Sequence, residues 1–318
     1  MFERTSRSWS MMKESWAVLQ QDKTLLLFPI LSSIACALIV ISFALPILVS
    51  PTLRNSVLTS SRSPNAQEVA EAPADAGQNH GVRNHADGDR FDFSPQRIIA
   101  ALVAFAFYLA TNFVVVFFNT ALVCCALSRF NGGNPTLSDG LSAATARLPQ
   151  ILGWSLLAAT VGTILKQIED RVPLVGKFAI SLIGMAWTVV TFMVVPILAA
   201  EKLGPIAAAK RSAELLRKTW GEALVGRVSL SAIQILFLLP VFLAIALAGV
   251  ISVSTESYWP FAVTLVIAVL FLILLSIVFS TLKQIFLAAV YQYAAQGTVP
   301  IGFSQNLIES AFAQKKKK

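Results

Sequence analysis

Hydrophobic and charged residues are strictly segregated along this chain. Six stretches contain no Asp, Glu, Lys or Arg, and only the third, with 18 residues, is shorter than 23. A helix needs about 20 apolar residues to cross a bilayer, so the pattern predicts six membrane-spanning helices. The six charge-free stretches are Thr24–Leu53, Ile98–Ser128, Leu148–Leu165, Phe178–Ala200, Val228–Thr255 and Ser257–Leu282.

The composition agrees with this pattern. Hydrophobic residues make up 56% of the 318 residues, charged residues make up 13%, and the mean hydropathy is +0.69. A soluble domain carries about 25% charged residues, so a water-soluble surface is excluded. The predicted fold class is all-α: a polytopic membrane helical bundle of six transmembrane helices with cytoplasmic amphipathic helices.

The segments between the apolar stretches complete this organisation. The loop after the first span has few large apolar residues, so it is expected to be disordered. A short helix is predicted before the third span, with Thr136 or Ser138 as its cap. The predicted segments are an amphipathic cytoplasmic helix (1–23), six spans (24–50, 98–128, 148–165, 178–200, 223–253, 260–294), a disordered extracytoplasmic loop (51–97), a cytoplasmic loop and helix (129–147), an outer hairpin (166–177), a basic cytoplasmic surface helix (201–222), an outer turn (254–259) and a cytoplasmic tail (295–318).

The basic residues predict the orientation of the spans. Lys and Arg collect in the short cytoplasmic loops of membrane proteins. If both termini are cytoplasmic, 17 of the 25 basic residues lie inside and eight lie outside, five of these eight on the long loop. Cytoplasmic termini are therefore expected.

One pattern occurs twice, each time just before an apolar stretch. "RSWSMMKESW" runs from Arg7 to Trp16, and "RSAELLRKTW" runs from Arg211 to Trp220. In the second copy an apolar face is predicted on one side, with the basic residues mainly away from it. Basic helices of this kind lie in the membrane plane, with Trp at the level of the headgroups. The predicted apolar face consists of Ile206, Ala209, Ala213, Leu216 and Trp220.

Both copies are therefore predicted to be cytoplasmic surface helices that bind the lipid bilayer, anionic lipids included. Whether they arose by duplication or by convergence stays open. The candidate membrane-surface residues are Trp9, Trp16, Lys210, Arg211, Arg217, Lys218 and Trp220.

Three runs carry a resemblance to a known family. They are "SWAVLQQDKTLLLFPILSSIA", "ARLPQILGWSLLAATVG" and "VVPILAAEKLGPIAAAKRSAELLRKTWGEALVG". They resemble a family of uncharacterised multi-pass prokaryotic membrane proteins that contain a domain of unknown function. The "KRSAELLRKTW" core is also remotely similar to the membrane domains attached to bacterial glycerophosphodiester phosphodiesterases. This resemblance implies a bacterial or archaeal cytoplasmic (inner) membrane and implies no reaction.

The usual constellations of catalytic residues are missing from the sequence. It has no nucleotide-binding glycine loop, no paired His on a helix and no G-x-S-x-G elbow. We expect a non-enzymatic membrane protein without catalytic residues, cofactor, metal or nucleic-acid partner. Its basic cytoplasmic face is expected to bind anionic lipid or a protein partner. Two alternatives remain: a transporter or channel for a small or lipidic solute, and an accessory membrane domain for a lipid-processing enzyme.

Overall fold

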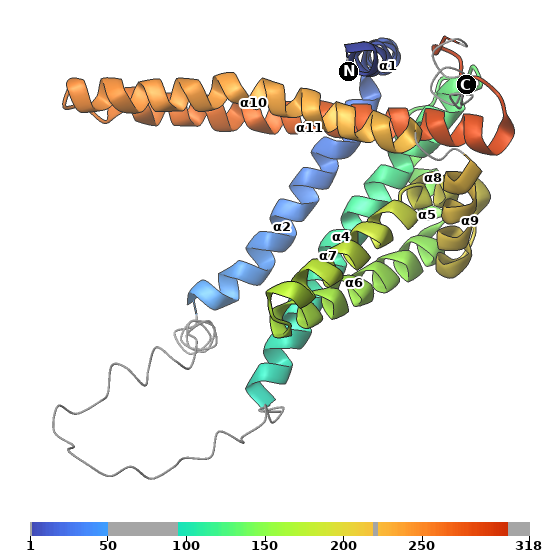
Figure 1. Ribbon diagram of the computed structural model, residues 1–318, viewed down its shortest axis with the longest axis horizontal. Helices are drawn as coiled ribbons and strands as arrows, with labels where there is room; N and C mark the ends of the chain where they lie inside the picture. Colours follow the sequence, from blue (N-terminus) through green and yellow to red (C-terminus); the bar gives the residue numbers. More distant parts are fainter. Residues whose placement is uncertain (1, 50–94, 219–221, 305–318) are drawn as a thin grey trace. The chain divides into compact units, whose positions relative to one another are not determined.

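The computed structural model describes residues 2–49, 95–218 and 222–304 (Figure 1). This part of the chain is helical and contains no strand. The predicted disordered loop and the end of the predicted tail lie outside it, except that α4 already begins at Pro95. The helices are α1 (Phe2–Gln21), η1 (Lys23–Leu26), α2 (Leu27–Val49), α4 (Pro95–Phe130), α5 (Leu137–Thr145), α6 (Leu148–Arg171), α7 (Leu174–Val190), α8 (Val194–Glu201), α9 (Pro205–Lys218), α10 (Glu222–Ser254) and α11 (Trp259–Gln296).

Among the described residues, six helical segments are long and apolar enough to cross a membrane. The all-α fold class with six spans is therefore confirmed. The six segments are Lys23–Pro46, Ile98–Phe130, Leu148–Asp170, Gly176–Glu201, Phe237–Ser254 and Trp259–Gln296.

The spans differ in detail from the charge-free stretches, as α6 and the fourth stretch illustrate. Helix α6 does not stop at the first charge but runs on to Arg171, and Lys166 pairs with Asp170 one turn later at 3.1 Å. Backbone hydrogen bonds continue through charged residues, so the end of an apolar run does not mark the end of a helix. The fourth stretch is divided at residues 191–193 into α7 and α8. Pro196 lacks an N–H and clashes with the carbonyl four residues earlier, which ends α7 before it.

The contacts divide the chain into two compact units. The smaller unit, residues 36–111, holds the second half of α2 and the first part of α4. Inside it, Phe43 and Phe107 form a T-shaped contact with ring centroids 5.4 Å apart. Large apolar side chains such as Leu45 and Leu102 are exposed there, as expected for residues that face lipid.

The larger unit, residues 1–35 and 112–318, contains the buried core. This core gathers where α2 begins and where α4, α8 and α11 end, together with parts of α1, α5, α6 and α9. We call this region the packed end.

Helix α5 in the packed end begins with a capped N-terminus and packs closely against α2. Thr136 caps α5 in a capping box with Asp139, as one of the two predicted caps. A Cβ on Gly140 would lie 2.5 Å from the Phe28 ring, so only glycine lets α5 approach this closely.

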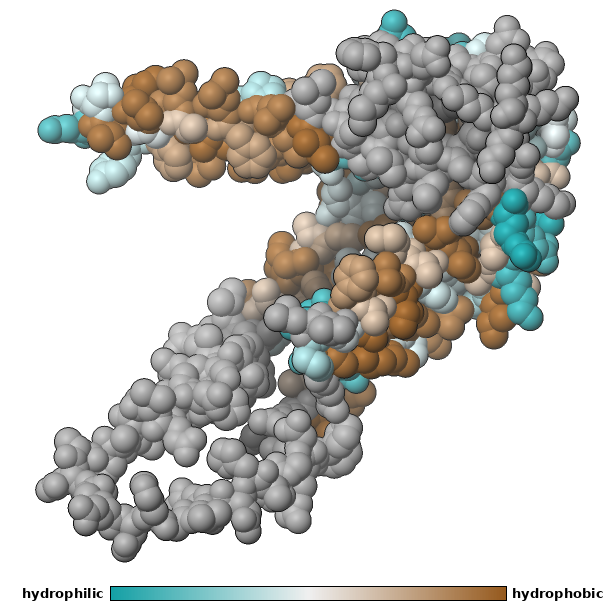
Figure 2. All heavy atoms as spheres, in the orientation of Figure 1, coloured by the Kyte–Doolittle hydropathy of each residue, from teal (hydrophilic) through white to brown (hydrophobic). Residues whose placement is uncertain are grey.

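The hairpin of α10 and α11 also belongs to the larger unit (Figure 1). Its distal part, Phe237–Ile277, is called the hairpin tip below. The tip carries exposed Leu, Ile, Val and Phe along both helices, and the surface of the hairpin in Figure 2 is correspondingly brown. Nearer the packed end, Lys283 of α11 donates a hydrogen bond to Gln234 of α10 at 2.9 Å.

Candidate functional site at the packed end

Helix α9 carries the second copy of the repeated pattern, and it is docked on the protein. Its buried side contains Ala208, Ser212, Leu215 and Leu216, none of which is more than 4% exposed. The helix contacts α6, α7, α8 and α11. The residues of the predicted apolar face are therefore divided. Leu216 is buried in the protein, whereas Ile206 is 65% exposed on the opposite side of the helix, beside the exposed Lys210 and Arg217. Ala208, Leu215 and Leu216 of this buried side belong to the hydrophobic core, and Ser212 adds a hydrogen bond to it.

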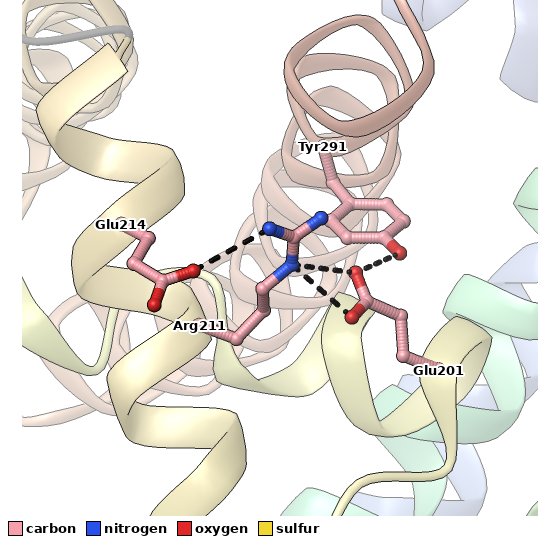
Figure 3. Close-up of polar contacts among 4 residues, drawn as sticks. All are labelled: Glu201, Arg211, Glu214 and Tyr291. Carbon is pink, nitrogen blue, oxygen red and sulfur yellow. Dashed lines mark hydrogen bonds and ion pairs between the residues drawn. The ribbon is translucent and has the colours of Figure 1, made fainter.

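Four polar side chains from three helices form a node that holds α9 in place (Figure 3). Arg211 Nε lies 3.3 and 3.2 Å from the two carboxylate oxygens of Glu201, at the end of α8. The Tyr291 hydroxyl of α11 donates a hydrogen bond of 2.9 Å to the same carboxylate. Arg211 Nη1 also lies 3.5 Å from Glu214, on the next turn of α9. Glu201 thus links α8, α9 and α11.

The contacts of Arg211 with Glu201 and with Glu214 differ in how far they are exposed to solvent. Glu201 and Arg211 side chains are 25% and 31% exposed, whereas Glu214 is 64% exposed. Burial alone would lower the pKa of Arg211, but the two carboxylates outweigh it and raise the pKa above its ordinary value. Tyr291 is 2% exposed, so its hydroxyl depends on Glu201 for a partner. The Glu201 contacts therefore contribute more to stability than the Glu214 contact.

A second contact from α9 provides a hydrogen-bond acceptor for a backbone N–H at the break between α7 and α8. The Met193 N–H donates to Ser212 Oγ at 3.0 Å, and both residues are fully buried. An unpaired N–H in this position would carry the full cost of desolvation. Arg211 and Ser212, the first two residues of the quoted repeat, thus act as docking residues.

Helix α1 carries the first copy of the pattern and is held by different contacts. Ser15, Val18 and Leu19 are buried, while Trp16 is 43% exposed. One carboxylate oxygen of Glu14 accepts hydrogen bonds from the backbone N–H and the hydroxyl of Ser304, at 3.2 and 2.7 Å. These contacts tie the segment after α11 to α1. None of them repeats a contact of the polar node on α9.

The predicted membrane-surface residues are placed as follows. Lys210 and Arg217 are exposed on the outer side of α9, and Arg211 is half-buried and paired. Lys218 is the last residue of α9, but its side chain lies outside the described part, as does that of Trp9 in α1. Trp220 falls entirely outside the described residues. The structure therefore brings Lys210, Arg211 and Arg217 to one helix but gives them different surroundings.

Four residues of the node and its neighbourhood were not predicted from the sequence: Glu201, Ser212, Glu214 and Tyr291. Glu201 had a detectable signal, since it is the first charge after the fourth apolar stretch. A carboxylate at a helix C-terminus is unfavourable with respect to the helix dipole, so it needs a cationic or donor partner nearby. Nothing in the local sequence indicates that one of the partners is Tyr291, which follows 90 residues later.

The six long apolar helices define this chain as a multi-pass helical membrane protein. It belongs to a family of unknown function, DUF6159, whose model matches residues 98–301. The match runs from the beginning of α4 to just past α11 and so includes the whole polar node. Membership of an uncharacterised family is what the resemblance implied. No curated protein and no solved structure matches the chain.

Proposed function

We propose that this membrane protein is not an enzyme and that it binds anionic lipid headgroups through the outer face of α9. In this proposal the packed end lies on the cytoplasmic side of a prokaryotic inner membrane, as the distribution of basic residues favours. The observation that carries the proposal is the outer face itself. Ile206 is 65% exposed, and one turn later Lys210 is exposed beside it.

The outer face combines an apolar anchor with cations. Ile206, Lys210 and Arg217 follow spacings of four and seven, which places them on one side of the helix. Lys202, just before α9, is exposed as well. Each cation near an anionic membrane surface contributes about 1 kcal/mol. An exposed isoleucine gains free energy by entering the interface, and it gains none in water.

The way α9 is docked supports separate roles for its two sides, one that packs on the protein and one that binds lipid. Because Arg211 and Ser212 fasten the opposite side of the helix to the bundle, Lys210 and Arg217 remain on the outside. The charge of Arg211 is already compensated by Glu201 and Glu214. The lipid-binding set in this proposal is therefore Ile206, Lys210 and Arg217, and Arg211 is a docking residue.

Transport is the main alternative function, and the break between α7 and α8 is the feature that favours it. Broken helices mark the substrate sites of many transporters, where the freed backbone faces a cavity. Here Phe192 and Met193 are buried in protein, and the Met193 N–H is bonded to Ser212. That arrangement favours a packing role for the break. The accessory-domain alternative is supported only by the remote resemblance of the α9 sequence.

A single cysteine at position 206 tests the proposal. In a variant with Cys36, Cys124 and Cys125 replaced by Ala, Ile206→Cys is reconstituted into anionic and into zwitterionic vesicles. We expect slow labelling by a water-soluble thiol reagent in the anionic vesicles only. Adding Lys210→Glu and Arg217→Glu should restore fast labelling, because repulsion replaces attraction.

The control cysteine replaces Asn134, an exposed residue in the turn before α5. It should label quickly in both lipids, and in cells only from the cytoplasmic side. Fast labelling of the Ile206→Cys variant in anionic vesicles would contradict lipid binding by α9. Labelling of the Asn134→Cys variant from the periplasmic side would contradict the orientation.

A further inference from the structure

The seam between α10 and α11 opens into a groove at the hairpin tip. The groove has a volume of about 670 Å³. The space exists because Ala244 and Ala248 of α10 have small side chains, and Ile251 and Val263 line the groove beside them. Volumes of about 300–1,000 Å³ are typical of sites for small ligands. The groove is thus large enough for a flexible chain of a membrane lipid.

The lining of the groove changes in polarity along its length. The helical part is lined mostly by apolar side chains, with Thr264 of α11 among them, while Thr255 and Ser257 line the part at the turn between the helices. Tyr258 and Trp259 at this turn are 88% and 77% exposed. Exposed Tyr and Trp at the end of a span are typical of the headgroup level of a bilayer. One end of the groove is therefore suited to an acyl chain and the other to a polar headgroup.

The charge at the turn specifies the headgroup further. Glu256 does not itself line the groove, but it is exposed in the turn between the lining residues Thr255 and Ser257, where its backbone has a φ of 49°. No Lys or Arg occurs between Arg227 and Lys283, so no cation near the turn in sequence balances this carboxylate. Carboxylates and aromatic faces both attract an ammonium group. A net anionic headgroup would be repelled by Glu256.

We propose that this groove binds a phospholipid with an amine-bearing headgroup. One acyl chain lies along the seam over Ala244 and Ala248, and the ammonium group lies at Glu256, Tyr258 and Trp259. The occupant comes from the bilayer because both helices of the hairpin are apolar enough to span it. This site is independent of the proposed function of α9, and it disfavours the anionic headgroups that α9 is proposed to bind.

Spin-labelled lipids test the site in the full chain reconstituted into vesicles. The probes are phosphatidylethanolamine and phosphatidylglycerol labelled on the acyl chain, and the measured quantity is the immobilised fraction in the electron paramagnetic resonance spectrum. We expect a preference for phosphatidylethanolamine of about two- to fivefold, as for a cation–aromatic contact at an exposed site. Glu256→Gln should reduce this preference.

Matched variants separate the groove from the general lipid shell. Ala244→Phe fills the groove, whereas Ala246→Phe adds the same ring at an exposed position that does not line it. The first should remove the extra immobilised phosphatidylethanolamine and the second should retain it. An equal immobilised fraction in the parent and both variants would overturn the proposal. So would a preference for phosphatidylglycerol, or a dimer of the chain that Ala244→Phe dissociates without changing the lipid spectrum.

Discussion

The packed end and the hairpin tip both contain many large apolar side chains, and α11 runs through both. From Trp259 to Leu274 its large apolar side chains are mostly exposed, for example Leu270 at 61%. From Phe279 to Gln292 it is largely buried, for example Leu282 at 2%. The buried half also carries Lys283, Gln284 and Gln292, but the leucines of both halves are equally apolar. The difference shows that the apolar side chains of one helix have two kinds of surroundings: the protein core in one half and the lipid-facing surface in the other.

The polar residues show the same contrast. At the packed end, Glu201, Ser212 and Tyr291 join helices that are far apart in sequence. At the hairpin tip, Ser254 and Thr255 donate hydrogen bonds to carbonyls one turn earlier. Ser252 Oγ accepts a hydrogen bond from the Phe261 N–H at 3.0 Å, which joins two helices that are consecutive in the chain. A polar group that bonds within its own helix adds nothing to the association of helices. Stability against unfolding is therefore expected to depend on the packed end.

The largest expected effect comes from one substitution made in both halves of α11. Leu282→Ala should lower the free energy of unfolding by about 2–5 kcal/mol, because it leaves a cavity in the core. Leu270→Ala should change it by less than about 0.5 kcal/mol, because that side chain is not packed in protein. Unfolding in mixed micelles, followed by circular dichroism, measures both. Similar losses for the two variants would break the comparison, since the hairpin tip would then also be packed against protein.

The next effect sharpens the comparison within the polar node. Glu201→Ala should cost about 2–3 kcal/mol, since it leaves the buried Tyr291 hydroxyl without its acceptor and Arg211 without its nearer carboxylate. Glu214→Ala should cost less than about 1 kcal/mol, as is usual for an exposed ion pair. Glu201→Gln keeps an acceptor for Tyr291 and should fall between them. Thermal unfolding in detergent ranks the three variants, and equal costs for Glu201→Ala and Glu214→Ala would show that the node does not fasten α9.

The smallest of these effects concerns the broken span. Ser212→Ala should cost about 1–2 kcal/mol, because the Met193 N–H loses its acceptor in a buried position. Hydrogen exchange at residues 191–197 should become faster in this variant. Ser254→Ala is the matched control, since its hydroxyl bonds only within α10. Unchanged exchange at residues 191–197 in Ser212→Ala would mean that the break is held by other contacts.

Several features of this protein are determined by its sequence alone. Six apolar stretches separated by charges predict six spans, because an apolar segment of about 20 residues is stable only across a bilayer or inside a core. The cap at Thr136 was predictable because it depends on residues three positions apart. The sequence also predicted that α9 has a basic surface, and Lys210 and Arg217 are indeed exposed on it.

Only the tertiary structure decided which side of α9 faces the protein, where the fourth span breaks, and which half of α11 is buried. Hydropathy gives the same value to a leucine in lipid and a leucine in a core, so it does not separate Leu270 from Leu282. The partners of Glu201 and Ser212 come from helices 10 to 90 residues away along the chain. Such contacts form only when packing brings the helices together, because a side chain's local sequence carries no information about a distant partner.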